Sequence, residues 1–156
     1  MNKLYFFLFL FLNFTILSQN SKIDSLIHVA AKDKNDSVKL NIYIKICDLC
    51  DIKDNLKYGQ VADLLATKLI AKSENEIEKL KFIRKNLYAY NIIRIYYQKI
   101  NNIDSIRLYQ ERAVKLAKTT RSANLIFETN ASYVGYIMMF QKDLALRLAY
   151  EKYGIK

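Results

Sequence analysis

Hydrophobic residues between positions 87 and 118 recur every three or four positions, in two runs separated by the polar pair Asn101-Asn102. This spacing puts each run on one face of an α-helix. We therefore predict a helical hairpin whose turn lies at the asparagine pair. A single hairpin cannot bury the apolar faces of both helices, so it needs helical neighbours. Its apolar positions are Leu87, Tyr90, Ile93 and Tyr97 in the first helix, and Ile103, Ile106, Ala113 and Ala117 in the second.

The same pattern occurs 47 residues earlier without a gap, so that Tyr43 matches Tyr90 and Ala66 matches Ala113. A looser third copy begins near Ser122. A two-helix unit that repeats along the chain is typical of an α-solenoid, in which each unit packs against the next. We predict an all-α fold, an α-solenoid of antiparallel helix pairs. Its units, about three in number, are residues 37–73, 74–120 and 121–156.

Residues 19–36 are expected to form a short helix and a turn before the first unit, because residues 21–32 have apolar positions at helical spacing. The next segment is ambiguous, since the alternating apolar residues between Val38 and Ile46 are also typical of a β-strand. We predict a helix there, because the apolar run continues to Cys50. Its repeat partner also lies inside a much longer helical stretch.

Residues 1–18 have the layout of a secretory signal peptide. Lys3 is followed by the apolar run Leu4–Leu17, and Ser18 is a small residue at the expected cleavage point. The run has 14 residues, whereas a membrane span needs about 20. We therefore expect a protein that is exported to the periplasm or secreted, with cleavage after Ser18. The alternative is an uncleaved segment that anchors the protein in the inner membrane.

The two clearer units carry aromatic, large apolar and small residues at matching positions. In the first unit these are Tyr43, Ile46, Cys47, Cys50, Gly59 and Ala66, and in the second they are Tyr90, Ile93, Tyr97 and Ala113. This pattern resembles the tetratricopeptide repeat family. Arg94 and Ile106 depart from it, because they stand where the family has small residues. A period of 47 also fits HEAT-like helix pairs, which are the alternative architecture.

In tetratricopeptide proteins the first helix of each unit lines a ligand groove, and the resemblance implies a groove of that kind here. Aromatic, amide and hydroxyl side chains suit an extended peptide, whose backbone needs hydrogen-bond donors and acceptors. A signal followed by repeats also resembles the N-terminal sensory region of bacterial membrane-bound signalling proteins. The expected function is therefore non-enzymatic binding of a protein or peptide outside the cytoplasm. The implied groove residues are Asn41, Ile44, Asp48, Tyr88, Asn91, Ile95, Gln98, Thr129, Ser132, Tyr136 and Met139.

The chain has 25 Lys and Arg against 15 Asp and Glu, which gives a net charge of +10. The positive charges are spread singly without a block of like charge, and this indicates a solvated surface. An alternative function is that of a basic helical protein that binds an anionic surface, either a membrane or a nucleic acid. We expect no nucleic acid partner, because no cluster of aromatic and basic residues is visible. Membrane contact is expected only through an uncleaved signal or a missing C-terminal part.

No residue pattern of a known enzyme class stands out. His28 is the single histidine, and no Gly-rich loop could cradle a phosphate. Cys47 and Cys50 form a C-x-x-C pair, for which packing, a disulfide, and redox or metal chemistry are the alternatives. Packing is favoured, since both match core positions and lie in mid-helix, away from the helix N-terminus that activates thiols. We expect no enzyme activity, no cofactor and no metal site.

Overall fold

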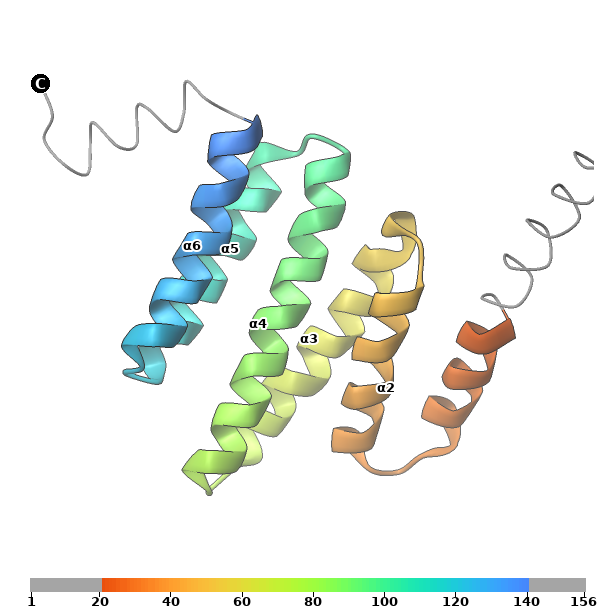
Figure 1. The fold of residues 1–156 in the computed structure, drawn as a ribbon. Coiled ribbons are helices and arrows are strands. Elements are labelled where there is room, and N and C mark those ends of the chain that lie inside the picture. The colour runs from red at the N-terminus through yellow and green to blue at the C-terminus, as the bar shows by residue number, and fades with distance from the viewer. Residues whose placement is uncertain (1–20, 141–156) are drawn as a thin grey trace, which may run out of the picture.

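The computed structural model describes residues 21–140, and this part of the chain is helical without a β-strand (Figure 1). The predicted all-α class is confirmed for these residues. The predicted signal peptide and the second half of the third unit lie outside them. None of the helices within 21–140 is both long and apolar enough to cross a membrane. The helices are residues 21–32, α2 (Asp36–Leu49), α3 (Asn55–Lys72), α4 (Glu76–Lys99), α5 (Ile103–Thr119) and α6 (Ala123–Phe140), with a short 3-10 turn, η1 (Ile52–Asp54), before α3.

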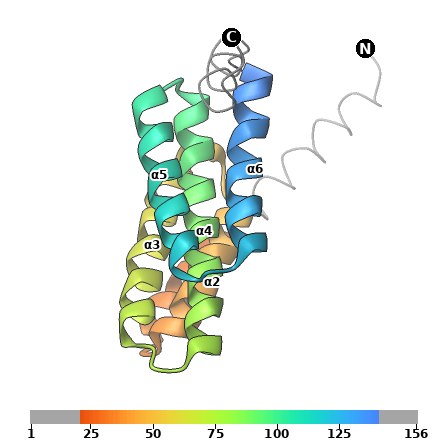
Figure 2. The ribbon, with the colours of Figure 1, turned by 90° about the vertical axis from the view of Figure 1, so that its left-hand side faces the viewer.

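The helices from α2 to α6 form two layers. α2, α4 and α6 stand side by side in one layer, and α3 and α5 stand in the other (Figures 1 and 2). Each helix packs chiefly against the next one along the chain, and neighbours run in opposite directions. The chain therefore changes layer at every turn, and the first helices of the three predicted units share one layer.

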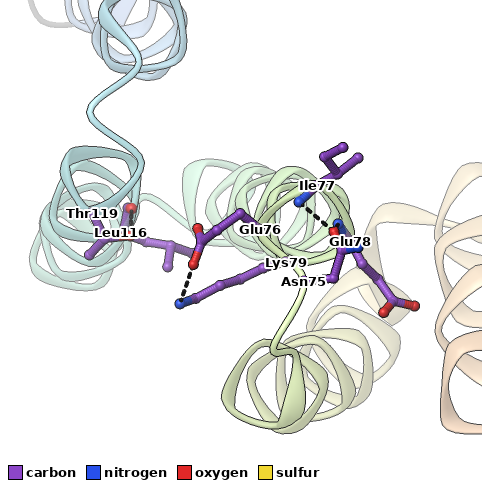
Figure 3. Close-up of polar contacts among 7 residues, drawn as sticks. All are labelled: Asn75, Glu76, Ile77, Glu78, Lys79, Leu116 and Thr119. Carbon is purple, nitrogen blue, oxygen red and sulfur yellow. Dashed lines mark hydrogen bonds and ion pairs between the residues drawn. The ribbon is translucent and has the colours of Figure 1, made fainter.

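Asparagine side chains begin three of these helices. The carboxamide oxygen of Asn75 accepts hydrogen bonds from the backbone N–H groups of Ile77 at 2.8 Å and Glu78 at 3.2 Å, at the start of α4 (Figure 3). Asn35 caps α2 and Asn102 caps α5 in a similar way. Asparagine suits this position because its side chain satisfies N–H groups that have no partner within the helix. The caps therefore define where α2, α4 and α5 begin.

The turn between α4 and α5 lies at the predicted asparagine pair. Asn101 has a φ of 54°, in the left-handed region that asparagine adopts more readily than most residues. The backbone N–H of Asn102 donates to the carbonyl of Tyr97 at 2.9 Å, and its side chain accepts from the N–H of Ser105 at 3.0 Å. The predicted hairpin is thus confirmed, with Asn101 reversing the chain and Asn102 starting the next helix.

Core residues that lie 47 positions apart in the two hairpins are buried to a similar degree. Ile46 and Ile93 are both fully buried, and Ala66 and Ala113 are both buried. Matched residues therefore occupy equivalent places in the two hairpins, with the same side of each helix turned inward. This agreement is what a repeated packing arrangement requires. The core between α2, α3 and α4 contains Leu40, Ala62, Ala66, Phe82 and Ala89.

The helix predicted in this segment is confirmed as α2, which ends at Leu49 with Cys50 as its C-cap, and its packing explains the strand-like alternation of its sequence. Leu40 is fully buried against α3 and α4. Ile42 packs in a different cluster, with Ile23 and Ile27 of the N-terminal helix. Because α2 is covered from more than one direction, apolar residues are spread around it and the helical period is blurred.

Candidate functional site

The residues predicted to line a groove all lie on α2, α4 and α6, which share one layer (Figure 1). On α2, Asn41 and Asp48 are exposed, whereas Ile44 is half-buried and packs against the core. On α4, Ile95 and Gln98 are half-buried. Three further members, whose side chains lie outside the described part of α6, are Ser132, Tyr136 and Met139.

Two polar contacts join α2 to α4 at the surface of this layer. The Lys85 ammonium donates a hydrogen bond to the Asn41 side-chain oxygen, and the Tyr88 hydroxyl donates to the Asp48 carboxylate. The bond to Asp48 raises the pKa of Tyr88 to about 12, so the phenol stays protonated at neutral pH. Asn41 and Asp48 therefore help to hold the two helices together.

A cavity of about 210 Å³ opens between α4, α5 and α6. Its lining includes three of the predicted groove residues, namely Tyr88, Asn91 and Thr129. Tyr88 is 39% exposed, while Asn91 and Thr129 are half-buried, so the cavity has both an accessible rim and a covered interior. The structure thus brings together residues that lie up to 41 positions apart in the sequence.

Arg94 is the most deeply buried charged residue in the lining, with only 5% of its surface exposed. One terminal nitrogen of its guanidinium donates to the side-chain oxygen of Asn91 at 2.6 Å, and the other donates to that of Gln110 on α5. Gln110 in turn donates to the backbone carbonyl of Thr129 on α6 at 3.1 Å. This chain of hydrogen bonds ties three helices together and fixes the guanidinium at the wall of the cavity.

The remaining lining combines aromatic and charged groups. Tyr90 and Tyr109 contact each other with ring centroids 5.8 Å apart, and both line the cavity. Burial raises the pKa of Tyr90 to about 12, so its hydroxyl also stays protonated at neutral pH. Arg84 and Glu128, both exposed, stand at the edge. The charged groups that line the cavity are therefore two arginines and one glutamate.

The sequence-based assignment of the groove missed Arg84, Arg94, Gln110 and Glu128. For two of them the sequence did carry a signal, because Arg94 departs from the repeat pattern and Gln110 interrupts the apolar spacing of its helix. A polar residue at a core position is often a partner in a buried network. Arg84 and Glu128 had no such signal, since exposed charges are common on any helix.

Cys47 and Cys50 have their thiols free, and the predicted packing role is confirmed for Cys47, which is buried in a cluster with Ile46 and Tyr58. The predicted mid-helix position is wrong, because Cys47 lies in the last turn of α2 and Cys50 is the C-cap that follows it. The Cys50 thiol lies 3.3 Å from the side-chain oxygen of Asn55 and donates to it. Burial raises the pKa of Cys47 to about 12 and that of Cys50 to about 11. Both thiols are therefore protonated at neutral pH, and the thiolate that redox chemistry requires is scarce.

Within residues 21–140, no group of three or more His, Cys, Asp or Glu side chains is placed to hold a metal ion. Comparison of the chain with protein-family models, with curated proteins and with solved structures finds no match. The likeness to tetratricopeptide repeats therefore rests on the pattern of residues in the sequence. The cavity between α4, α5 and α6 is the feature from which a function can be argued.

Proposed function

We propose that this protein is a helical-repeat scaffold of the tetratricopeptide type, which binds a peptide or a segment of another protein outside the cytoplasm. The binding surface is the layer of α2, α4 and α6, and no catalytic step is involved. The arrangement of first and second helices in separate layers supports this assignment (Figure 2). The matched burial of Ile46 and Ile93 supports the repeat relationship between the two hairpins.

The observation that carries the proposal is the cavity between α4, α5 and α6. Binding sites for ligands are usually concave and mostly apolar, with a few polar groups that fix orientation. The rings of Tyr90 and Tyr109 supply apolar surface here, and Asn91 and Arg94 supply polar groups. The cavity is small, so it suits one side chain of a ligand whose remaining length extends over the neighbouring helices.

The chemistry of the layer also suits the backbone of an extended peptide. Such a backbone presents N–H donors and carbonyl acceptors at regular intervals. Asn91 uses its side-chain oxygen to accept from Arg94, which leaves the amide N–H groups as donors that can face a ligand. Gln98 is half-buried two helical turns further along α4 and offers both a donor and an acceptor.

The proposed location rests on the sequence of residues 1–18. Export places the repeats outside the cytoplasm, where a scaffold meets secreted or membrane-bound partners. The same order, with a signal followed by repeats, supports a role as the sensory part of a signalling protein. In that role, the ligand that binds to the layer of α2, α4 and α6 is the signal, and the other parts of the signalling protein respond to it.

A peptide selection tests the proposal. Random peptides displayed on phage are selected on the wild-type protein, and the enriched peptides are measured by fluorescence polarisation. We expect Asn91→Ala to weaken their binding by about tenfold or more, the scale of losing one well-placed hydrogen bond in a covered site. Gln60→Ala is the matched control, because it removes an exposed amide from α3 in the other layer.

Two outcomes would contradict the proposal. The first is that no peptide is enriched, or that Gln60→Ala weakens binding as much as Asn91→Ala does. The second is binding that ignores peptide sequence and collapses between low and moderate salt. That result would favour the alternative of a basic protein on an anionic surface, for which the net charge of +10 supplies the attraction.

A further inference from the structure

We propose that a groove between α3 and α4 binds an acidic amphipathic helix that belongs to a partner protein. The groove has a volume of about 530 Å³ and lies along the first half of α3, with the end of α4 as its other wall. The residues that line it differ from those that line the cavity between α4, α5 and α6. Binding in the groove is therefore independent of the proposed function and adds a second interaction surface.

The apolar side chains of the groove indicate that it is covered by a partner. Leu64 on α3 is 71% exposed, whereas Leu56 and Val61 on the same helix are half-buried. Tyr96 of α4, also half-buried, lines the other wall. The residue 47 positions after Leu64 is Glu111, which is also exposed, so the repeat accepts a charged side chain at this place. The leucine is therefore not required by the fold, and a partner that covers it removes apolar surface from water.

The direction of the groove indicates a helical occupant. Leu56, Val61 and Leu64 follow one side of α3, and the first and last are eight residues apart. This separation corresponds to about 12 Å along the helix axis. A second helix that lies beside α3 presents apolar residues at matching intervals on one face. It also satisfies its own backbone N–H and carbonyl groups, whereas an extended peptide would leave them facing leucine and valine side chains.

The charges of the groove indicate that this helix is acidic. In the described part of the chain, the charged residues that line the groove are Lys53 and Lys57, both exposed at the end nearest to η1. Lys53 lies 3.7 Å from the carboxylate of Asp51 in an exposed pair, which contributes little. The Lys57 ammonium lies 5.0 Å from the centroid of the Tyr58 ring, which leaves its positive charge uncancelled. Acidic residues at one end of the partner helix would therefore meet opposite charge.

Charge and shape argue against other occupants of the groove. In a two-fold dimer centred on the groove, a second copy would bring its own Lys53 and Lys57 toward those of the first, and each copy has a net charge of +10. Residues 1–20 and 141–156 of this chain both contain more basic than acidic residues. An anionic membrane suits the lysines, but a flat bilayer does not enter a recess whose wall is the half-buried Tyr96. An acidic helix of another protein fits both the charge and the shape.

The test is fluorescence polarisation of a labelled peptide titrated with the full chain. The peptide is capped and has about 18 residues, long enough to form a helix in water. It has leucines along one face and two glutamates at one end of that face. We expect saturable binding at submillimolar concentrations. The same peptide with lysines in place of the glutamates should bind about tenfold more weakly or worse, and so should a version of the glutamate peptide with a central proline, which breaks the helix.

Two isoleucine and leucine positions of equal exposure give a matched pair of variants. Leu64→Gln should weaken the binding of the glutamate peptide by about tenfold, as expected when one leucine of the groove is lost. Ile77→Gln is the control, because Ile77 is 70% exposed and lies at the opposite end of α4 from Tyr96. It should leave the affinity unchanged. Circular dichroism checks that both variants are folded.

Reversal of the two lysines tests the charge of the partner. The double variant Lys53→Glu and Lys57→Glu should bind the lysine peptide more tightly than the glutamate peptide, which reverses the preference of the wild-type protein. The control is the double variant Lys115→Glu and Lys118→Glu, which changes the net charge equally at exposed positions near the end of α5. This control should keep the preference for the glutamate peptide.

Several results would overturn the proposal. Absence of binding of the glutamate peptide, or equal affinity for the glutamate and lysine peptides, would exclude an acidic helix as the occupant. Equal effects of Leu64→Gln and Ile77→Gln would place the binding outside the groove. Tight binding of the proline peptide would show that the occupant is not helical. Sedimentation with phosphatidylglycerol vesicles that is lost in Lys53→Glu and Lys57→Glu, without binding of the glutamate peptide, would assign the groove to an anionic membrane instead.

Discussion

Replacing Gly59 by alanine would put a methyl group into the contact between α3 and α4. A Cβ atom at this position would lie 2.8 Å from Cγ1 of Ile93 and 3.4 Å from Cγ2 of Ile92. Carbon atoms in contact prefer a separation of about 3.5–4.0 Å. Ile93 is fully buried, so its side chain has little room to move aside. The substitution therefore forces the two helices apart or pushes Ile93 away from its preferred rotamer.

Two opposing effects set the size of the change. Overpacking of a buried contact costs about 1–3 kcal/mol. Alanine in place of glycine inside a helix contributes about 1 kcal/mol in the other direction. We expect Gly59→Ala to destabilise the wild-type protein by about 1 kcal/mol. In an Ile93→Ala background the obstructing carbon is absent, and the same substitution should stabilise the protein by about 1 kcal/mol.

Urea denaturation of the four proteins in this cycle, followed by circular dichroism, measures the coupling between the two sites. The pair Gln60→Ala and Gln60→Gly is the control, since it reports the difference between alanine and glycine at the neighbouring exposed position. The control gives the difference in the free energy of unfolding between Gln60→Ala and Gln60→Gly. The reasoning is refuted if Gly59→Ala raises the free energy of unfolding of the wild-type protein by that same amount. That result would mean that α3 and α4 are not in close contact there.

Three further predictions follow from other parts of the fold. Tyr97→Ala should lower the free energy of unfolding by about 2–3 kcal/mol, because the half-buried ring stacks on Tyr109 with centroids 5.8 Å apart. An unchanged melting temperature would contradict this packing. Cys47 and Cys50 should react with iodoacetamide much more slowly in the folded protein than in urea at pH 8, because burial raises both pKa values, to about 12 and about 11; equal rates would show that the thiols are accessible. Burial raises the pKa of Asp63 in the folded state, so the folded protein holds this proton more tightly than the unfolded chain does. The stability of the folded protein should therefore fall as the pH rises from about 4, the ordinary pKa of an aspartate, through the raised pKa of Asp63. Urea denaturation across this pH range should show a smaller fall in stability for Asp63→Asn. Identical pH profiles for the two proteins would refute the assignment.

The helices and their turns could be predicted because local sequence determines them. Apolar spacing and the pair Asn101-Asn102 located α4, α5 and the turn between them. The repeat offset also identified Ile46 and Ile93 as equivalent core residues. These predictions needed no knowledge of how the helices are arranged in space, because each helix must turn its apolar face inward.

The segment from Val38 to Ile46 shows how local and long-range signals compete. Its alternation alone favours a strand, whereas the length of the apolar run and the comparison with the second unit favoured a helix. The structure supplies the missing reason, because α2 is packed between the N-terminal helix on one side and α3 and α4 on the other. No local pattern contains that information.

The candidate site was harder to predict than the fold. The resemblance to tetratricopeptide repeats implied that Tyr88, Asn91 and Thr129 lie on one surface, and all three line the cavity. It could not show that Arg94 and Gln110 meet across two helices, since the partner of a buried polar residue depends on helix rotation and contact. A polar residue that interrupts an apolar pattern is therefore a candidate for a buried hydrogen-bond network, but its partners can be identified only from the structure.

The central claim is that a ligand binds the layer of α2, α4 and α6. Mapping the backbone amide shifts of the full chain on addition of a selected peptide tests this claim most directly. The account predicts that the largest shifts fall on these three helices and gather around Tyr88, Asn91 and Thr129. Shifts confined to α3 and α5 would place the binding surface on the opposite layer and contradict the proposed function.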